Sequence, residues 1–185
     1  MNSFYTKEEL TLIGFKKYGE NVLISRFASL YNPEKIVIGN NVRIDDFCIL
    51  SGEIVFQNNI HISAYSALFG KYGIIMEDFT GLSPRCTIFS ASDDFSGDFL
   101  ISPMNPEKYT KVIGGKVLIK KFSQVGAGSI VMPDLTINEG VAIGAMSFVK
   151  KSLEAWAIYA GNPIRYIKQR KKGLLEYYNE ITNEK

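Results

Sequence analysis

The chain is poor in the residues and segments that mark several common protein classes. It contains a single histidine among 185 residues, which excludes a metal centre built from several histidines of one chain. Its net charge of +2 is far from the strong basic excess of nucleic-acid-binding domains. No apolar run approaches the roughly 20 residues of a membrane span. We therefore expect no metal, no nucleic-acid partner and no integral membrane association.

The first residues also lack the apolar stretch of a signal peptide, because Lys7, Glu8 and Glu9 stand where it would lie. This predicts a cytoplasmic protein. Hydrophobic residues make up 46% of the chain, so it is long and apolar enough to bury one sizeable core. We expect one domain with a short appendage.

What the chain has in abundance is a repeat of apolar, mostly aliphatic residues at every sixth position, with short insertions near Pro33 and after Leu68. Neither an α-helix nor a single strand has this period. The repeated positions include Ile38, Ile44, Leu50, Phe56, Ile62, Leu68, Met76, Leu82, Ile88, Ile119, Val125, Val131, Ile137, Ile143 and Val149. A hexapeptide β-helix has this period, because each unit is a short strand with a tight turn and stacked units share one core.

The residue four positions after each repeated one is small or aliphatic, with Ile74 in that place after the insertion that follows Leu68, and this predicts a second inward-facing column. Both cysteines, Cys48 and Cys86, fall in this column and are interpreted as buried thiols. With three hexads per coil they lie two coils apart, about 10 Å at the usual strand spacing, which is too far for a disulfide.

The repeat divides the chain into three parts. Residues 1–21 are expected to form an N-terminal cap, residues 22–153 the β-helix, and residues 154–185 a C-terminal segment. The β-helix is interrupted once by a long excursion loop at residues 93–116. A loop of this length inside a compact repeat is usually functional.

Two helices are expected outside the repeat. The first is short, with a capping box formed by Thr6 and Glu9 and an apolar face of Leu10, Leu12 and Ile13. The second is a basic C-terminal helix. Its basic residues are Arg165, Lys168, Arg170, Lys171 and Lys172.

The chain resembles the hexapeptide-repeat acyltransferases, nearest the galactoside and maltose O-acetyltransferases and the polysaccharide and nucleotide-sugar acetyltransferases. The hexads carry the resemblance, together with residues 125–131 (VGAGSIV), 143–150 (IGAMSFVK) and 160–165 (AGNPIR). It covers nearly the whole chain. It implies an all-β solenoid, a left-handed parallel β-helix with a long excursion loop, a short N-terminal helix and a C-terminal α-helix.

The resemblance also implies a homotrimer, with active sites in the clefts between subunits and acetyl-CoA as donor. In matching positions, Ala127 and Ala145 would lie beside the pantetheine arm, and Ser63 and Lys71 near the acceptor. The residues implied near the CoA phosphates are Lys150, Lys151, Arg165 and Lys168. A phosphorylated donor needs cations of this kind. The simpler alternatives are tight β-helix turns for the small residues and a solvated helix face for the basic ones.

The chain departs from that branch at the start of the long loop, where the branch uses a histidine as general base. Asp93 stands there, followed by Asp94, and the single histidine is His61. An unperturbed aspartate, with a pKa of about 3.9, is a poor base for a hydroxyl. We hypothesise that His61 is the base and that Asp93 or Asp94 of a neighbouring subunit orients it or holds the sugar. A surface histidine and a turn-capping aspartate pair are the alternatives.

An amine acceptor would remove the need for a base, because a neutral amine already carries its lone pair. The site would then need groups that position the two substrates, a carboxylate for the resulting ammonium, and a hydrogen-bond donor to the oxyanion. Asp93 and Asp94 suit this role. A backbone N–H near Gly126 or Gly144 would be the oxyanion donor.

The leading prediction is therefore acetyl transfer from acetyl-CoA to a sugar hydroxyl, in cell-surface polysaccharide or O-antigen biosynthesis. The alternative is N-acetylation of a nucleotide-linked amino sugar. A non-catalytic β-helix scaffold would share the fold but would not bind acetyl-CoA. A carbonic-anhydrase-like metalloenzyme of the same fold would need several histidines.

Overall fold

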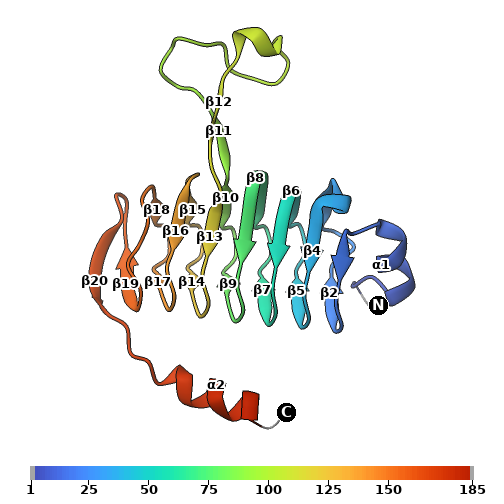
Figure 1. Cartoon of the computed structure of the whole chain (residues 1–185), viewed down its shortest axis with the longest axis vertical. Coiled ribbons are helices and arrows are strands. Elements are labelled where there is room, and N and C mark those ends of the chain that lie inside the picture. The colour runs from blue at the N-terminus through green and yellow to red at the C-terminus, as the bar shows by residue number, and fades with distance from the viewer. Residues whose placement is uncertain (1–2, 184–185) are drawn as a thin grey trace.

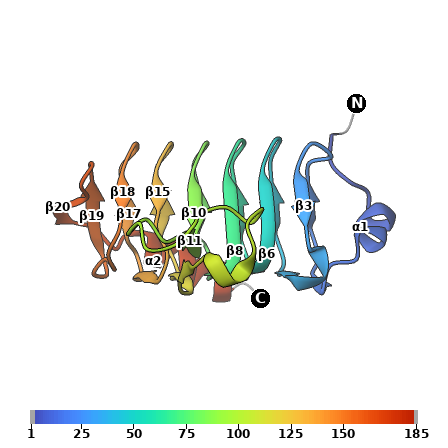
Figure 2. The ribbon, with the colours of Figure 1, turned by 90° about the horizontal axis from the view of Figure 1, so that it is seen from above.

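The computed structural model describes residues 3–183, and the chain is a parallel β-solenoid of about seven turns with two α-helices. Figures 1 and 2 show its coils in a row, with helix α1 (Lys7–Ile13) at one end and strand β20 (Arg165–Gln169) at the other. None of the described helices is long and apolar enough to cross a membrane. The predicted fold class is confirmed.

The first face of the solenoid is an eight-stranded sheet. Its strands, in spatial order, are β2 (Val22–Ile24), β5 (Val42–Ile44), β7 (Ile60–Ile62), β9 (Gly81–Leu82), β14 (Gln124–Val125), β17 (Ala142–Ile143), β19 (Ala157–Ala160) and β20. All neighbours are parallel except β19 and β20, because each coil returns in the same direction.

A ten-stranded sheet supplies the other two faces, because β6 (Ile49–Phe56) and β8 (Ala67–Met76) run across both. The second face contains β3 (Ser29–Tyr31), the first halves of β6 and β8, β10 (Thr87–Phe89), β15 (Ile130–Val131) and β18 (Phe148–Val149). The third face contains β1 (Lys17–Tyr18), β4 (Ile36–Ile38), the second halves of β6 and β8, β13 (Val117–Ile119) and β16 (Leu135–Ile137).

The core lies inside the coils and follows the six-residue repeat. Every repeated apolar residue from Ile38 to Val149 is buried. The second inward column is buried as well, from Val42 to Leu153, except at Ser92, where the chain leaves the solenoid. Each inward side chain packs on the same position of the next coil, which is why the repeat predicts the core so well.

Both cysteines are free thiols in the second inward column. The parallel register places Ser66 between Cys48 and Cys86, so they are two coils apart, as predicted. Burial raises the pKa of each thiol to about 11. A thiol with so high a pKa is almost entirely protonated near neutrality and is a poor nucleophile.

The solenoid extends beyond the predicted limits of residues 22–153 at both ends. Strand β1 already pairs with β4, and β19 continues the first face. Helix α1 covers the N-terminal end, with the predicted capping box between Thr6 and Glu9. Leu10 is buried, but Leu12 is 85% exposed, so the predicted apolar face of α1 is narrower than expected.

The excursion loop is a hairpin that stands away from the solenoid (Figure 1). Its stem is β11 (Ala91–Asp93) paired antiparallel with β12 (Val112–Gly114), and its tip contains a short 3₁₀ helix, η2 (Glu107–Tyr109). We call residues 91–114 the arm. Its position between β10 and β13 places its base at the edge between the second and third faces.

The C-terminal segment differs from the prediction of a basic helix that starts near Arg165. Residues Arg165–Gln169 form β20, which covers the open edge of β19. The backbone groups of β19 can thus pair with a strand, which a helix would not provide. Helix α2 (Leu174–Asn183) begins only after Gly173, and it contains none of the predicted basic residues.

The same segment is fastened to the solenoid by two side chains. The Arg170 guanidinium donates to the backbone carbonyls of Phe122 (2.8 Å) and Gly140 (3.0 Å), and its burial lowers its pKa. From α2, Tyr178 packs edge-on against the ring of Phe122, with 5.1 Å between ring centroids, and its hydroxyl accepts from Lys121 Nζ at 2.7 Å.

Candidate active site

One edge of the solenoid carries the arm and a row of pockets. This arm edge, between the second and third faces, is formed by residues 52–53, 70–73, 132–134 and the base of the arm. Two adjoining cavities, of about 660 and 420 Å³, both have Asp93 in their walls. Their other lining residues include Phe69, Phe89, Phe95, Met132 and Lys71. The carboxylate can hold an amine, and the apolar side chains around it keep water away from that amine.

Asp93 ends β11, and Asp94 continues its pairing, with its N–H donating to the Lys111 carbonyl at 2.9 Å. The two side chains have different surroundings, because neighbouring residues of paired extended backbone point to opposite sides. The Asp93 carboxylate accepts one hydrogen bond, from the Ser102 backbone N–H at 3.3 Å, and faces both cavities. The Asp94 carboxylate accepts from the Ser96 backbone N–H at 2.7 Å and lies 3.4 Å from Lys111 Nζ. The pKa of Asp94 is lowered mainly by the hydrogen bond from Ser96 and to a smaller extent by Lys111. Asp94 thus holds the arm together, and Asp93 is left facing the cavities.

The residues predicted to line the pantetheine arm lie on another edge. This glycine edge, between the first and second faces, consists of the turns at residues 45–48, 63–66, 83–86, 126–129 and 144–147. It carries Ser63, Ala127 and Ala145. A Cβ on Gly126 would come within 2.5 Å of the Ile143 carbonyl oxygen, so only glycine fits this turn.

The predicted oxyanion donors are also on the glycine edge. The Gly126 and Gly144 N–H groups already donate, to the carbonyls of Ile143 and Tyr159 respectively, each at 2.8 Å. They are therefore not available to an oxyanion. Within residues 3–183, the N–H groups of Ala127 and Ala145 have no protein acceptor, and the same holds for Asp46 and Ala64 at the matching position of earlier turns.

His61 lies on the first face, points outward as predicted, and is half-exposed. Its Nε2 is 2.7 Å from Asp45 Oδ2, and Asp45 Oδ1 accepts from Arg43 Nε at 2.7 Å. Partial burial opposes ionisation of Asp45, but the bonds from Arg43 and His61 outweigh it and lower its pKa. Within one chain the carboxylate partner of His61 is thus Asp45, where the hypothesis named Asp93 or Asp94.

The predicted phosphate-binding cations fall into two groups. Lys150 and Lys151 follow β18, and the pairing of Val131 with Val149 places them one coil beyond residues 132–133 on the arm edge. Arg165 and Lys168 lie on β20, at the end of the first face. Only the first group shares an edge with Asp93.

One chain therefore brings together Asp93, Lys71, Lys150 and Lys151 on the arm edge. It does not bring them to His61, or to Ser63, Ala127 and Ala145 on the glycine edge. Two further lysines of the arm edge, Lys16 and Lys35, lie several coils before Asp93 and were not predicted, because they precede the long loop by more than fifty residues. The part of the chain that the structure describes contains no cluster of three or more side chains able to hold a metal.

Known proteins place this solenoid in a family. No family model matches the chain. The chain is 44% identical over 171 residues, 91% of its length and 89% of the relative, to an Escherichia coli enzyme named dTDP-4-amino-4,6-dideoxy-D-glucose acyltransferase. A single-residue variant of AntD, an N-acyltransferase from Bacillus cereus, has been solved with dTDP-4-amino-4,6-dideoxyglucose and coenzyme A. Its match extends over 100% of this chain and 100% of that one, at 53% identity and a TM-score of 0.97. AntD with dTDP and 3-hydroxybutyryl-CoA, at 54% identity, covers 100% of this chain and 98% of that one, with a TM-score of 0.97.

The chain belongs to the hexapeptide-repeat acyltransferases, and the predicted enzyme class is confirmed. Within this class, the E. coli and B. cereus relatives are named for a nucleotide-linked amino sugar or for N-acyl transfer. They favour the alternative prediction, N-acylation of a nucleotide-linked amino sugar, over the leading prediction of O-acetylation of a sugar hydroxyl.

Proposed function

We propose that this enzyme transfers an acyl group from a CoA thioester to the amino group of a nucleotide-linked amino sugar, with dTDP-4-amino-4,6-dideoxyglucose as the candidate acceptor. The identity to the E. coli enzyme over nine-tenths of the chain carries the proposal. Asp93 adds chemical support, because a carboxylate suits an amine acceptor better than a hydroxyl.

The neutral amine attacks the thioester carbonyl carbon, a C–N bond forms, and the C–S bond then breaks. The nitrogen loses one proton, which ends on the CoA thiol. Asp93 holds an amine N–H and stabilises the positive charge that develops on nitrogen. No histidine is needed in this sequence of steps, in agreement with the position of His61 on another face of the chain.

A second candidate residue for this chemistry is Ser83. Solved variants of AntD replace one serine or one aspartate, ten positions apart in that enzyme. This chain contains one serine–aspartate pair at that spacing, Ser83 and Asp93. Ser83 lies on the glycine edge, where its hydroxyl accepts from Gln124 Nε2 at 3.3 Å. With the Ala127 and Ala145 N–H groups, the Ser83 hydroxyl is a candidate hydrogen-bond donor to the oxyanion.

Ser83 and Asp93 lie on different edges of one chain, which supports a site formed between two copies. The arm edge of one subunit would face the glycine edge of the next, and the predicted homotrimer would contain three such sites. The molar mass measured by light scattering, as the protein elutes from a size-exclusion column, should then be about three times the 20.7 kDa of one chain. A fully active monomer would overturn this arrangement.

The CoA thioester would lie along the C-terminal coils, with its phosphates near Lys150 and Lys151. Acetyl-CoA is the predicted donor, and the 3-hydroxybutyryl-CoA bound to AntD suggests a second acyl group to test. A place in cell-surface polysaccharide synthesis remains a prediction from the resemblance.

The test of the function measures release of the CoA thiol from acetyl-CoA and from 3-hydroxybutyryl-CoA, with products weighed by mass spectrometry. dTDP-4-amino-4,6-dideoxyglucose is compared with dTDP-glucose, which carries a hydroxyl in place of the amine and an additional hydroxyl on carbon 6. We expect release and an amide product with the amino sugar alone. Release with dTDP-glucose or simple glycosides, and none with the amino sugar, would return the assignment to O-acetylation.

A further inference from the structure

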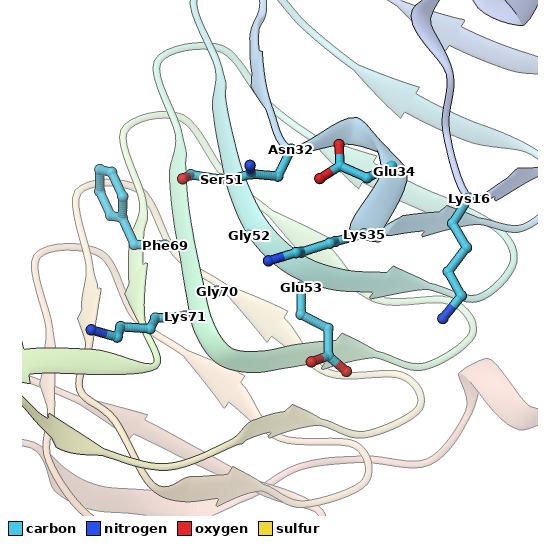
Figure 3. Close-up of a pocket in the computed structure, with 10 residues that line it drawn as sticks. All are labelled: Lys16, Asn32, Glu34, Lys35, Ser51, Gly52, Glu53, Phe69, Gly70 and Lys71. Atoms are coloured by element: carbon cyan, nitrogen blue, oxygen red, sulfur yellow. The ribbon is translucent and has the colours of Figure 1, made fainter.

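A third cavity, of about 680 Å³, lies on the arm edge on the N-terminal side of Asp93 (Figure 3). Its floor is the bend of β6 and β8 at Gly52 and Gly70, where a Cβ on Gly52 would meet the Gly70 carbonyl oxygen at 2.8 Å. Lysines stand around this floor. They are Lys16, Lys35 and Lys71. We call this cavity the lysine pocket.

Lys16 and Lys35 are held in the same wall of the pocket, although they belong to separate segments of the chain. Lys35 ends the 3₁₀ helix η1 (Pro33–Lys35), whose insertion interrupts the repeat. The Lys16 backbone N–H donates to the carbonyls of Pro33 (3.2 Å) and Ile36 (3.1 Å), which ties its segment to η1. Figure 3 shows Lys16 and Lys71 bordering the pocket from opposite sides.

These ammonium groups are available to a ligand. Among residues 3–183, none of the three lysines makes an ion pair within 4.0 Å. Glu34 and Glu53 also line the pocket, so its formal charge is +1. The lysines would therefore act on individual phosphate oxygens at short range, since the pocket as a whole has no strong field.

The lysine pocket adjoins the cavity at Asp93. Phe69 and Lys71 line both. The coils that carry Lys35, Glu53, Lys71 and Asp93 are consecutive, so the first and last are about 14 Å apart at the usual strand spacing. An amino sugar and two phosphates can extend across this gap, with the flexible lysine side chains reaching toward them.

We propose that the lysine pocket binds the diphosphate of the nucleotide-linked acceptor. The inference rests on the proposed function and adds the orientation of the two substrates along the arm edge. The acceptor lies on the N-terminal side of Asp93 with its phosphates on Lys16, Lys35 and Lys71. The CoA phosphates lie on the C-terminal side, near Lys150 and Lys151. The two substrates thus approach Asp93 from opposite ends of one edge.

The experiment measures the affinity of the full chain for dTDP and, separately, for CoA by isothermal titration calorimetry. Lys16→Gln and Lys35→Gln are compared with Lys17→Gln, an exposed lysine next to Lys16 that lies on β1 and does not line the pocket. We expect each pocket variant to weaken dTDP binding about tenfold, because each removes a charge-assisted hydrogen bond. Lys17→Gln should bind dTDP like the unaltered protein, and CoA affinity should be unchanged in all three.

The outcomes separate this inference from the proposed function. If the enzyme acylates the amino-sugar nucleotide while Lys16→Gln and Lys35→Gln bind dTDP normally, the inference is wrong and the function stands. If these variants lose CoA affinity instead, the pocket holds the donor. If the unaltered protein neither binds dTDP nor acylates the amino sugar, both proposals fail.

Discussion

Asp93→Asn is expected to lower kcat/KM for the amino-sugar nucleotide by about 100-fold, which corresponds to the ~2–3 kcal/mol of a hydrogen bond between charged groups. Asparagine keeps the shape of the side chain but cannot balance the charge that develops on the attacking nitrogen. Its amide NH₂ can also donate toward the amine, which needs an acceptor. The assay is CoA thiol release at saturating acyl-CoA.

Two matched variants test whether the effect belongs to this carboxylate. Asp98→Asn changes an exposed aspartate near the tip of the same arm, and it should leave kcat/KM within about twofold, as most exposed substitutions do. His61→Gln should also retain most activity if the acceptor is an amine. Loss of activity in His61→Gln with little change in Asp93→Asn would restore the histidine base and remove Asp93 from the chemistry.

Phe56→Ala is expected to lower the free energy of unfolding by about 3–5 kcal/mol, the usual cost of emptying a buried aromatic site. Phe56 is 1% exposed and stands in the inward column of the third face, between Ile38 and Met76 of the adjoining coils. Removal of its ring leaves a cavity that touches three coils at once. Denaturant unfolding at one fixed protein concentration measures the loss.

Val55→Ala is the control, because Val55 precedes Phe56 on the same strand and points outward. It should lower the unfolding free energy by at most about 1 kcal/mol, as expected of a partly exposed site. An equal loss in both variants would mean that the alternation of inward and outward residues on β6 does not determine stability.

The six-residue repeat determined most of the fold. From Ile38 to Val149 each repeated residue is buried, because a solenoid makes the same local contact in every coil, and a local periodic contact is visible in a sequence. The interruption of the repeat at residues 93–116 predicted the arm, because a break in a periodic pattern is as visible in a sequence as the pattern itself. The repeat carries no information beyond Leu153, which explains why β20 was expected to be a helix.

The candidate site could be predicted only in part. Replacement of the expected histidine by Asp93 was visible in the sequence and pointed to an amine acceptor as the alternative. The sequence could not choose between Asp93 and Asp94, because a shift of one residue along a strand reverses the side to which a side chain points. The bonds of Asp94 to Ser96 and Lys111 make that choice in the folded arm.

The sequence by itself therefore determined the solenoid, its buried columns, the place of its single long interruption and the enzyme class. Only the tertiary structure decided which residues meet at the arm edge. Lys16, Lys35 and Lys71 come together there, and His61 is paired with Asp45 on another face. Such contacts join residues whole coils apart through irregular insertions and side-chain directions, and neither follows from a repeating pattern of hydrophobic residues.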